Sequence, residues 1–138
     1  MVVKLIAHTL IEKDGKYLLI KRSKIKRGLP NVYPCYWDIP GGSVEESELP
    51  REAALREAME EVNQKIRIDK IIHEDSQFDS RKNSVFTRLV YGARIIDQRD
   101  ILLDPEEHSD FVWITSLKDL EEELIVPYLI DIFADRST

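Results

Sequence analysis

The sequence has one cysteine, Cys35, and no long apolar run. A single cysteine cannot form an intramolecular disulfide bond, so the chain must rely on its hydrophobic core, and a reducing compartment is expected. No stretch approaches the about 20 apolar residues that a membrane-spanning helix needs. The first residues are typical of a strand and a turn, not of a cleaved leader. We therefore expect a cytoplasmic globular protein that does not span a membrane.

Positive charge is also in short supply. The chain carries 20 Lys and Arg against 26 Asp and Glu, a formal net charge of −6. Nucleic acid is a poor partner for such a chain, because backbone phosphates require Lys and Arg. The one nucleic-acid substrate still considered is an RNA 5′ end. A phosphorylated substrate would need a divalent cation between itself and the carboxylates.

The 138 residues predict one domain, residues 1–138, of the α+β class with a mixed sheet. The apolar pattern and the turn signals, such as Asp14-Gly15, indicate strands and loops. Strands are expected at 2–11, 16–22, 37–39, 65–78, 84–96 and 111–114, and loops at 23–36 and 97–110. A helix should run from Ser47, as N-cap, to Val62, with Asn63 as its left-handed stop. A second helical segment should begin at Leu117 and be broken by Pro127.

The first helix has an unusual charge pattern. At about 100° per residue, Glu57, Glu60 and Glu61 fall on one face. The opposite face is apolar, and we expect its residues Leu55, Met59 and Val62 to pack on the core. Two small side chains, Ala53 and Ala54, lie on the carboxylate face and should leave space above it.

A solvated acidic face is the simplest explanation of these carboxylates. Against it, Glu57 and Glu61 form a repulsive i,i+4 pair, and Glu60 and Glu61 lie at the negative end of the helix dipole. Within the helix, no Lys or Arg follows them at i+3 or i+4. Converging, charged oxygen ligands are what a hard cation requires, so the pattern favours a metal site.

Residues 42–64 resemble the signature box of the Nudix hydrolases. That pattern is a Gly, five residues, a Glu, seven residues, Arg-Glu, an aliphatic residue, any residue, Glu-Glu, any residue, a Gly and an aliphatic residue. Every charged position and both spacings match. Ala58, Asn63 and Gln64 depart from it: Asn63 can still end the helix, whereas Ala58 and Gln64 suggest looser packing.

The resemblance implies a Nudix-like α/β/α sandwich with a mixed β-sheet. It also implies hydrolysis of a nucleoside diphosphate linked to another group, with Mg²⁺ or Mn²⁺ as cofactor and a (d)NTP-type substrate as the default. By similarity, the metal ligands would be Glu57, Glu60, Glu61 and the Gly41 carbonyl. Arg56 would orient Glu57, and Glu48 would support the site.

Other candidate residues rest on weaker signals. Glu107, before the last strand, resembles an extra base or ligand of many Nudix enzymes, although a solvated turn is an equal explanation. Arg22 could contact a substrate phosphate or be a plain surface arginine. Phe78, Tyr33 and Tyr36 could stack on a base or pack locally.

Two other functions and the oligomeric state stay open. Isopentenyl diphosphate isomerases share the Nudix fold and use a cysteine. Because this chain has Cys35, an isomerase of that kind is an alternative function. A non-catalytic nucleotide-binding regulatory module on the same fold is the other, although this chain retains every glutamate of the box. A homodimer is compatible with the sequence.

Overall fold

The computed structural model describes residues 1–136. The elements in chain order are β1 (Val2–Lys13), β2 (Lys16–Arg22), β3 (Ile25–Lys26), β4 (Leu29–Pro30), β5 (Trp37–Asp38), β6 (Gly41–Ser43), α1 (Pro50–Val62), β7 (Lys65–Asp79), β8 (Ser84–Asp97), β9 (His108–Ile114), a 3₁₀ helix (Leu117–Leu120) and α2 (Pro127–Arg136). No helix within this range is long and apolar enough to cross a membrane.

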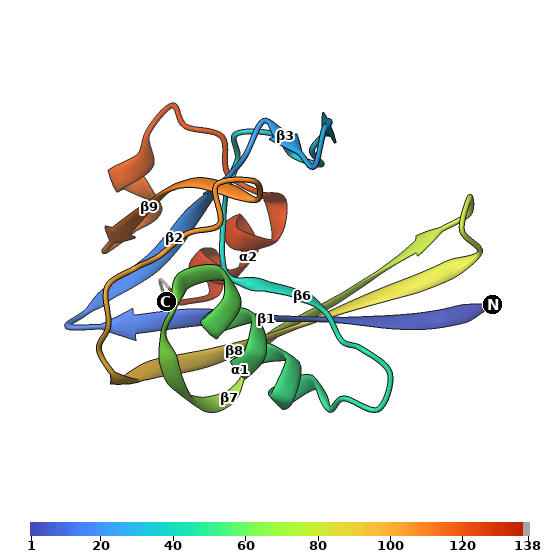
Figure 1. The fold of residues 1–138 in the computed structure, drawn as a ribbon, viewed down its shortest axis with the longest axis horizontal. Helices are drawn as coiled ribbons and strands as arrows, with labels where there is room; N and C mark the ends of the chain where they lie inside the picture. The colour runs from blue at the N-terminus through green and yellow to red at the C-terminus, as the bar shows by residue number, and fades with distance from the viewer. Residues whose placement is uncertain (137–138) are drawn as a thin grey trace.

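A mixed sheet forms the centre of the molecule (Figure 1). Its strands follow the order β5-β2-β1-β8-β7, while β6 pairs with β1 and β9 pairs with β2. β1 and β8 run parallel, and the other pairs in this sheet run antiparallel. The Asp14-Gly15 turn joins β1 to β2 with both residues at positive φ, as expected of a tight hairpin.

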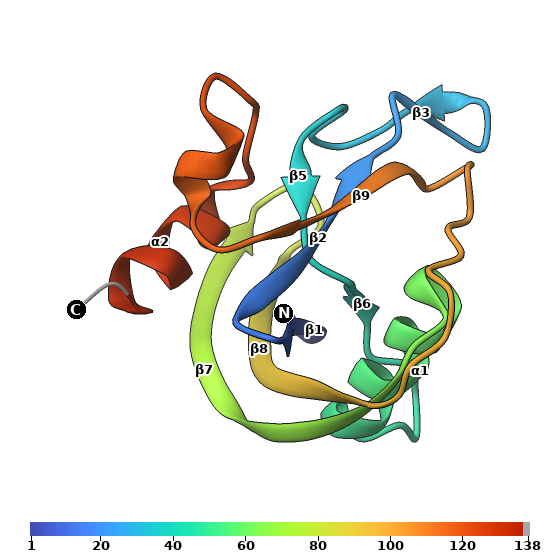
Figure 2. The same cartoon turned by 90° about the vertical axis from the view of Figure 1, so that its left-hand side faces the viewer.

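The two α-helices of the described chain lie on opposite sides of the sheet (Figure 2). Side chains alternate between the faces of a strand, so neighbouring residues serve different helices. Leu10 and Leu19 belong to the core under α2, whereas Ile11 and Leu18 belong to the core under α1. The predicted α+β fold with helices around a mixed sheet is confirmed.

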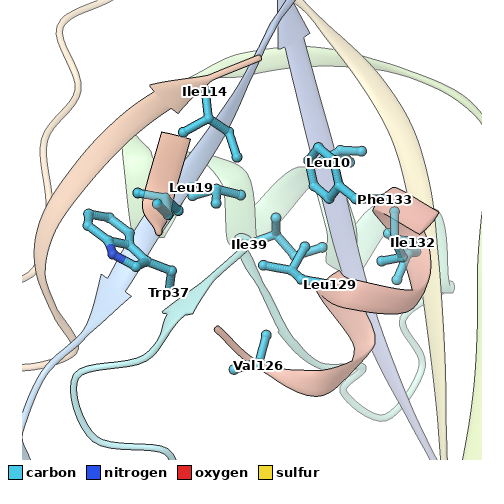
Figure 3. Packing of buried hydrophobic residues seen from close by; sticks show 11 residues of the cluster. Leu10, Leu19, Trp37, Ile39, Ile114, Val126, Leu129, Ile132 and Phe133 are labelled. Carbon is cyan, nitrogen blue, oxygen red and sulfur yellow. The ribbon is translucent and has the colours of Figure 1, made fainter. Parts of the chain in front are cut away.

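The core under α2 is built from long aliphatic side chains. Leu129 and Ile132 pack with Leu10, Leu19 and the other buried residues labelled in Figure 3. Pro127 begins this helix instead of breaking one, since proline is well suited to a first helical position where no N–H is needed. The prediction of a helix interrupted at Pro127 was therefore wrong.

Helix α1 begins later than predicted. Its N-cap is Leu49, and Ser47 lies in a left-handed turn with φ 65° before it. Pro50 occupies the first helical position, and the Glu52 carboxylate accepts a hydrogen bond of 2.8 Å from the Leu49 N–H. The stop at Asn63 is confirmed, because its φ is 58° and its N–H donates to the Met59 carbonyl at 3.1 Å.

Of the three large apolar residues of α1 that were predicted to face the core, only Val62 is buried. Leu55 and Met59 are 42% and 37% exposed, whereas the alanines on the other side are fully buried. Ala53 and Ala54 pack against Ala7 and Tyr91, so they fill a close helix–sheet contact and leave no space there. Small side chains let the helix approach the sheet, and this carries Glu61 into the interior.

The predicted looser packing at Ala58 and Gln64 was also wrong. Ala58 is buried in the core under α1. Gln64 is buried too, and its Nε2 donates to the Arg99 carbonyl at 2.7 Å. The amide thus ties the segment after β8 to the end of the helix.

The two predicted loops contain strand structure. Residues 23–36 include the small β3–β4 hairpin. The last strand begins at His108, so the expected loop over 97–110 ends earlier than predicted. Pairing of β9 with β2 decides this boundary, since Arg22 lies opposite His108 in the register.

Candidate active site

A cleft of about 350 Å³ opens beside α1 and the Gly41-Gly42 strand. Its lining mixes acidic, basic and ring-bearing side chains from both halves of the chain. These are His8, Arg22, Lys26, Tyr33, Asp38, Glu57, Glu61, Arg88, Glu107, His108 and Tyr128.

Two glycines bring backbone close to the carboxylates. Gly41 and Gly42 belong to β6, which pairs with β1 so that Gly41 lies opposite His8. A β-carbon on Gly41 would collide with the His8 ring, and one on Gly42 would lie 2.7 Å from Glu57 Oε1. Only glycine therefore allows β6 to lie between β1 and the helix.

Arg56 joins three glutamates on the outer side of α1. Its Nε donates to Glu48 Oε2 at 2.8 Å, and its Nη1 donates to Glu57 Oε1 at 2.9 Å and Glu60 Oε2 at 3.2 Å. The hydrogen bonds from Arg56 lower the pKa of Glu48 to about 2. The guanidinium thus holds the Glu57 carboxylate, which lines the cleft, whereas Glu60 is 58% exposed.

Glu61 is the most buried carboxylate of the helix. Its side chain is 5% exposed, and Oε1 accepts a hydrogen bond from the Gly41 N–H at 3.1 Å. Burial and the neighbouring Glu57 carboxylate raise the pKa of Glu61 well above its usual range. His108 Nδ1 lies 3.7 Å from Glu61 Oε2 and has no hydrogen-bond partner within residues 1–136. Burial lowers the pKa of His108 to about 4, so at neutral pH it does not compensate the Glu61 charge.

The donor set of Glu57, Glu61 and the Gly41 backbone fits a hard divalent cation, which prefers converging oxygen ligands. No group of three His, Cys, Asp or Glu side chains is already gathered as a metal cage among the described residues. Glu60 accounts for part of this, because it faces Arg56 instead of the cleft. Its exposure leaves the side chain free to turn without disturbing the core.

Asp38 organises a second set of buried polar groups, which the sequence did not identify as a site. Its carboxylate accepts hydrogen bonds from Arg22 Nη1 at 3.0 Å, from the Ile39 N–H at 2.7 Å and from the Tyr128 hydroxyl. Burial and Asp38 raise the pKa of Tyr128, so this hydroxyl stays protonated. We call Arg22, Asp38 and Tyr128 the Asp38 cluster. Tyr128 is 90 residues away from Asp38, so no local sequence pattern could link them.

Arg22 lines the cleft, but its donors are already engaged. Besides the Asp38 bond, Nε donates to the Val32 carbonyl at 2.6 Å and Nη2 donates to Asn31 Oδ1 at 3.1 Å. The predicted phosphate contact by Arg22 thus competes with a structural role in holding the loop after β4.

Three of the weaker candidates, Tyr36, Phe78 and Cys35, do not line the cleft, whereas Tyr33 does. Phe78 is 55% exposed and lies opposite Val85 near the turn of the β7–β8 hairpin. This hairpin extends away from the helices (Figure 1). The structure therefore does not bring Phe78 to the site. Cys35 also does not line the cleft, which removes the geometric basis for an isomerase-like cysteine.

Glu107 does line the cleft, immediately before β9. Lys26 Nζ lies 3.0 Å from Glu107 Oε1, and Arg27 Nη2 lies 4.0 Å from the same oxygen. The β3–β4 hairpin thus brings positive charge to the cleft, where the loop predicted at 23–36 meets the loop predicted at 97–110.

Comparison with known proteins agrees with this geometry. A family model described as the NUDIX domain matches residues 4–133. The chain belongs to the NUDIX family. The predicted Nudix pyrophosphohydrolase is thereby confirmed at the level of enzyme class.

This Nudix hydrolase has similar relatives in bacteria and archaea. It is 31% identical to the nucleoside triphosphatase NudI of Escherichia coli (strain K12). The 113 aligned residues cover 76% of this chain and 77% of the relative. The MutT NUDIX hydrolase from Burkholderia pseudomallei has a TM-score of 0.74 at 25% identity, covering 96% of this chain and 97% of that one. For the MutT protein from Methanosarcina mazei Go1 the TM-score is 0.76, with 25% identity and coverage of 99% and 95%.

Proposed function

We propose that this Nudix hydrolase cleaves nucleoside triphosphates to a nucleoside monophosphate and diphosphate, with Mg²⁺ or Mn²⁺. In the reaction, a water oxygen bonds to the α-phosphorus and the bond to the β-phosphate oxygen breaks. The similarity to a nucleoside triphosphatase supports the substrate class. The family typically uses a divalent metal.

The acidic residues of α1 would hold the cation. Glu57 and Glu61 are the cleft-facing ligands in this proposal, with Gly41 contributing its backbone oxygen and Glu60 turning in from the rim. When bound, the cation neutralises the diphosphate and makes a bound water more acidic. Arg56 keeps Glu57 in place through its 2.9 Å hydrogen bond, and Glu48 holds Arg56 in turn.

Glu107 is the proposed proton acceptor for the attacking water. It lines the cleft from the segment immediately before β9, so it belongs to another element than the ligands. Its partner Lys26 lies at the same mouth and can pair with a substrate phosphate when Glu107 turns to water.

One observation carries the proposal: Glu61 is a buried carboxylate beside Glu57, and its basic neighbour His108 is neutral at pH 7. Burial and Glu57 favour the protonated form of Glu61 when no cation is present, and a bound cation would instead stabilise both carboxylates in their charged form.

The test is product analysis. The protein is incubated with each nucleoside triphosphate in millimolar Mg²⁺ and, in parallel, in excess chelator. We expect nucleoside monophosphate and diphosphate to form in equal amounts in the samples with Mg²⁺ and not in the samples with chelator. Absence of hydrolysis with every triphosphate, or full activity in chelator, would overturn the proposal.

A further inference from the structure

Arg88 lies at the wall of the cleft in an unusual setting. It sits on β8 opposite Ile6 of β1, and its Cζ is 3.7 Å from the centre of the Tyr128 ring. Its Nη1 donates to Asp75 Oδ1 at 2.9 Å. Stacking and the ion pair together hold the guanidinium plane in one orientation.

Two nitrogens of this guanidinium, Nε and Nη2, have no hydrogen-bond partner among the described residues. Arg88 Nε is buried and has no hydrogen-bond partner within the part of the chain that the structure describes. A buried donor without an acceptor is costly, and Arg22, in the same cleft, has all three of its nitrogens bonded. Nη2, unlike Nε, is not buried, and Arg88 lines the cleft, so a molecule that enters the cleft can supply an acceptor to Nη2.

Asp38 offers the complementary group. Oδ1 accepts from the Ile39 N–H and the Tyr128 hydroxyl, while Oδ2 accepts from Arg22 alone. A carboxylate oxygen can accept two hydrogen bonds, so Oδ2 keeps one free position. Tyr128 connects the two groups, with its hydroxyl on Asp38 and its ring against Arg88. Tyr128 therefore contacts both the acceptor and the donor and fixes their relative position.

We propose that Arg88 and Asp38 select the nucleobase of the substrate, with Arg88 donating to a base carbonyl and Asp38 accepting from a base N–H. This inference rests on the proposed triphosphate hydrolysis. The phosphates bind beside Glu57 and Glu61 with their cation, which leaves the neutral base for the remaining wall of the cleft. Guanine, cytosine and uracil carry both a carbonyl and an N–H group. Adenine has no carbonyl and would leave the Arg88 donor unpaired.

The experiment compares GTP, CTP, UTP and ATP at one Mg²⁺ concentration. We expect kcat/KM for ATP to be at least about tenfold below that of the best of the other three, the effect of losing one hydrogen bond to a charged group. Arg88→Met and Arg88→Lys should both bring this ratio close to one, because lysine keeps the charge but not the planar donor. Arg94→Met is the matched control: Arg94 pairs with Glu12 at 3.4 Å outside this cleft, so the ratio should not change.

A second measurement separates base recognition from hydrolysis. Calorimetric binding of GMP, CMP, UMP and AMP in chelator needs neither metal nor turnover, and AMP should bind most weakly to the wild type. If no triphosphate is hydrolysed, the proposed function fails while these affinities still decide the inference. Equal use or binding of adenine by wild type overturns it. A second result also overturns it: Arg88→Met lowers kcat/KM equally for all four triphosphates, and Arg88→Lys restores it. In that case Arg88 acts through its charge, as a phosphate-binding residue, and does not select the base.

Discussion

Two sets of buried charges share the cleft, and they are balanced in different ways. In the Asp38 cluster, one carboxylate has a guanidinium, a hydroxyl and a backbone N–H as partners. On α1, Glu61 has one backbone N–H and a neutral histidine, and the nearby Glu57 repels it. Each oxygen of the Asp38 carboxylate thus has a donor within the protein, whereas Glu61 has no positively charged partner at neutral pH among the described residues.

The buried charge of the Asp38 cluster stabilises the fold, whereas that of the Glu57–Glu61 pair lowers the stability of the metal-free fold. A buried carboxylate with all its partners present supports the fold, and removing it leaves those partners unsatisfied. A buried carboxylate without a cation weakens the metal-free fold and strengthens binding of a metal ion. Substitutions in the two regions should therefore have opposite effects on stability.

The largest expected effect is on turnover at the helix. Glu57→Gln and Glu60→Gln should each reduce kcat by about two to four orders of magnitude, because each removes a charged ligand. Steady-state kinetics at saturating Mg²⁺ measure this. Glu46→Gln, an exposed acid on the loop before α1, serves as control and should leave kcat unchanged. Near wild-type turnover in Glu57→Gln would remove α1 from the active site.

At the cleft mouth, Glu107→Gln should reduce kcat by about a hundredfold while changing KM little, as for a proton acceptor. Glu106→Gln is the matched control one residue earlier, outside the cleft lining, and should have almost no effect. Equal, negligible effects of both substitutions would make the acidic segment a solvated turn.

In the Asp38 cluster, Asp38→Asn should destabilise the fold by about 3 kcal/mol, with or without Mg²⁺. The amide places an N–H group among donors from Arg22, Ile39 and Tyr128 that all need an acceptor. Denaturant unfolding measures the change. Asp97→Asn, which breaks an exposed pair with Arg99 at 3.3 Å, is the control and should stay within about 1 kcal/mol of wild type. A wild-type stability for Asp38→Asn would show that the cluster is not a stabilising network.

The smallest expected effect has the opposite sign. In chelator, Glu61→Gln should be more stable than wild type by about 0.5–1 kcal/mol, since it relieves the repulsion from Glu57 and the unfavourable position in the helix dipole. In millimolar Mg²⁺ the order should reverse, because only the wild type gains the binding energy of the cation. Paired melting curves check this. A mutant that is less stable in chelator would reveal a favourable partner of the Glu61 carboxylate.

The same pair of proteins should differ in pH dependence. The pKa of Glu61 is higher in the metal-free folded state than in the unfolded chain, so the stability that its protonated form contributes is lost as pH rises through the folded pKa. The advantage of Glu61→Gln in chelator should therefore be largest at pH 8 and shrink as pH falls toward 5. Melting at both pH values tests the sign, and a constant difference would contradict the raised pKa.

Local patterns in the sequence predicted much of the secondary structure. The hairpin at Asp14-Gly15, the long strands β7 and β8 and the helix stop at Asn63 follow from turn chemistry and apolar periodicity, which act between near neighbours. The start of β9 could not be predicted in this way, because its pairing partner β2 lies about 90 residues earlier.

The charged spacing between Gly42 and Glu61 by itself determined the family and the set of candidate ligands. Only the tertiary structure decided that the alanine side of α1 faces the sheet and that Glu61 is buried. It also joined Asp38 to Tyr128 and left Arg88 Nε without an acceptor. Periodicity records which residues share a face of an element. Which face is buried, and which distant side chain completes a hydrogen bond, depends on packing between elements, and no local pattern contains that information.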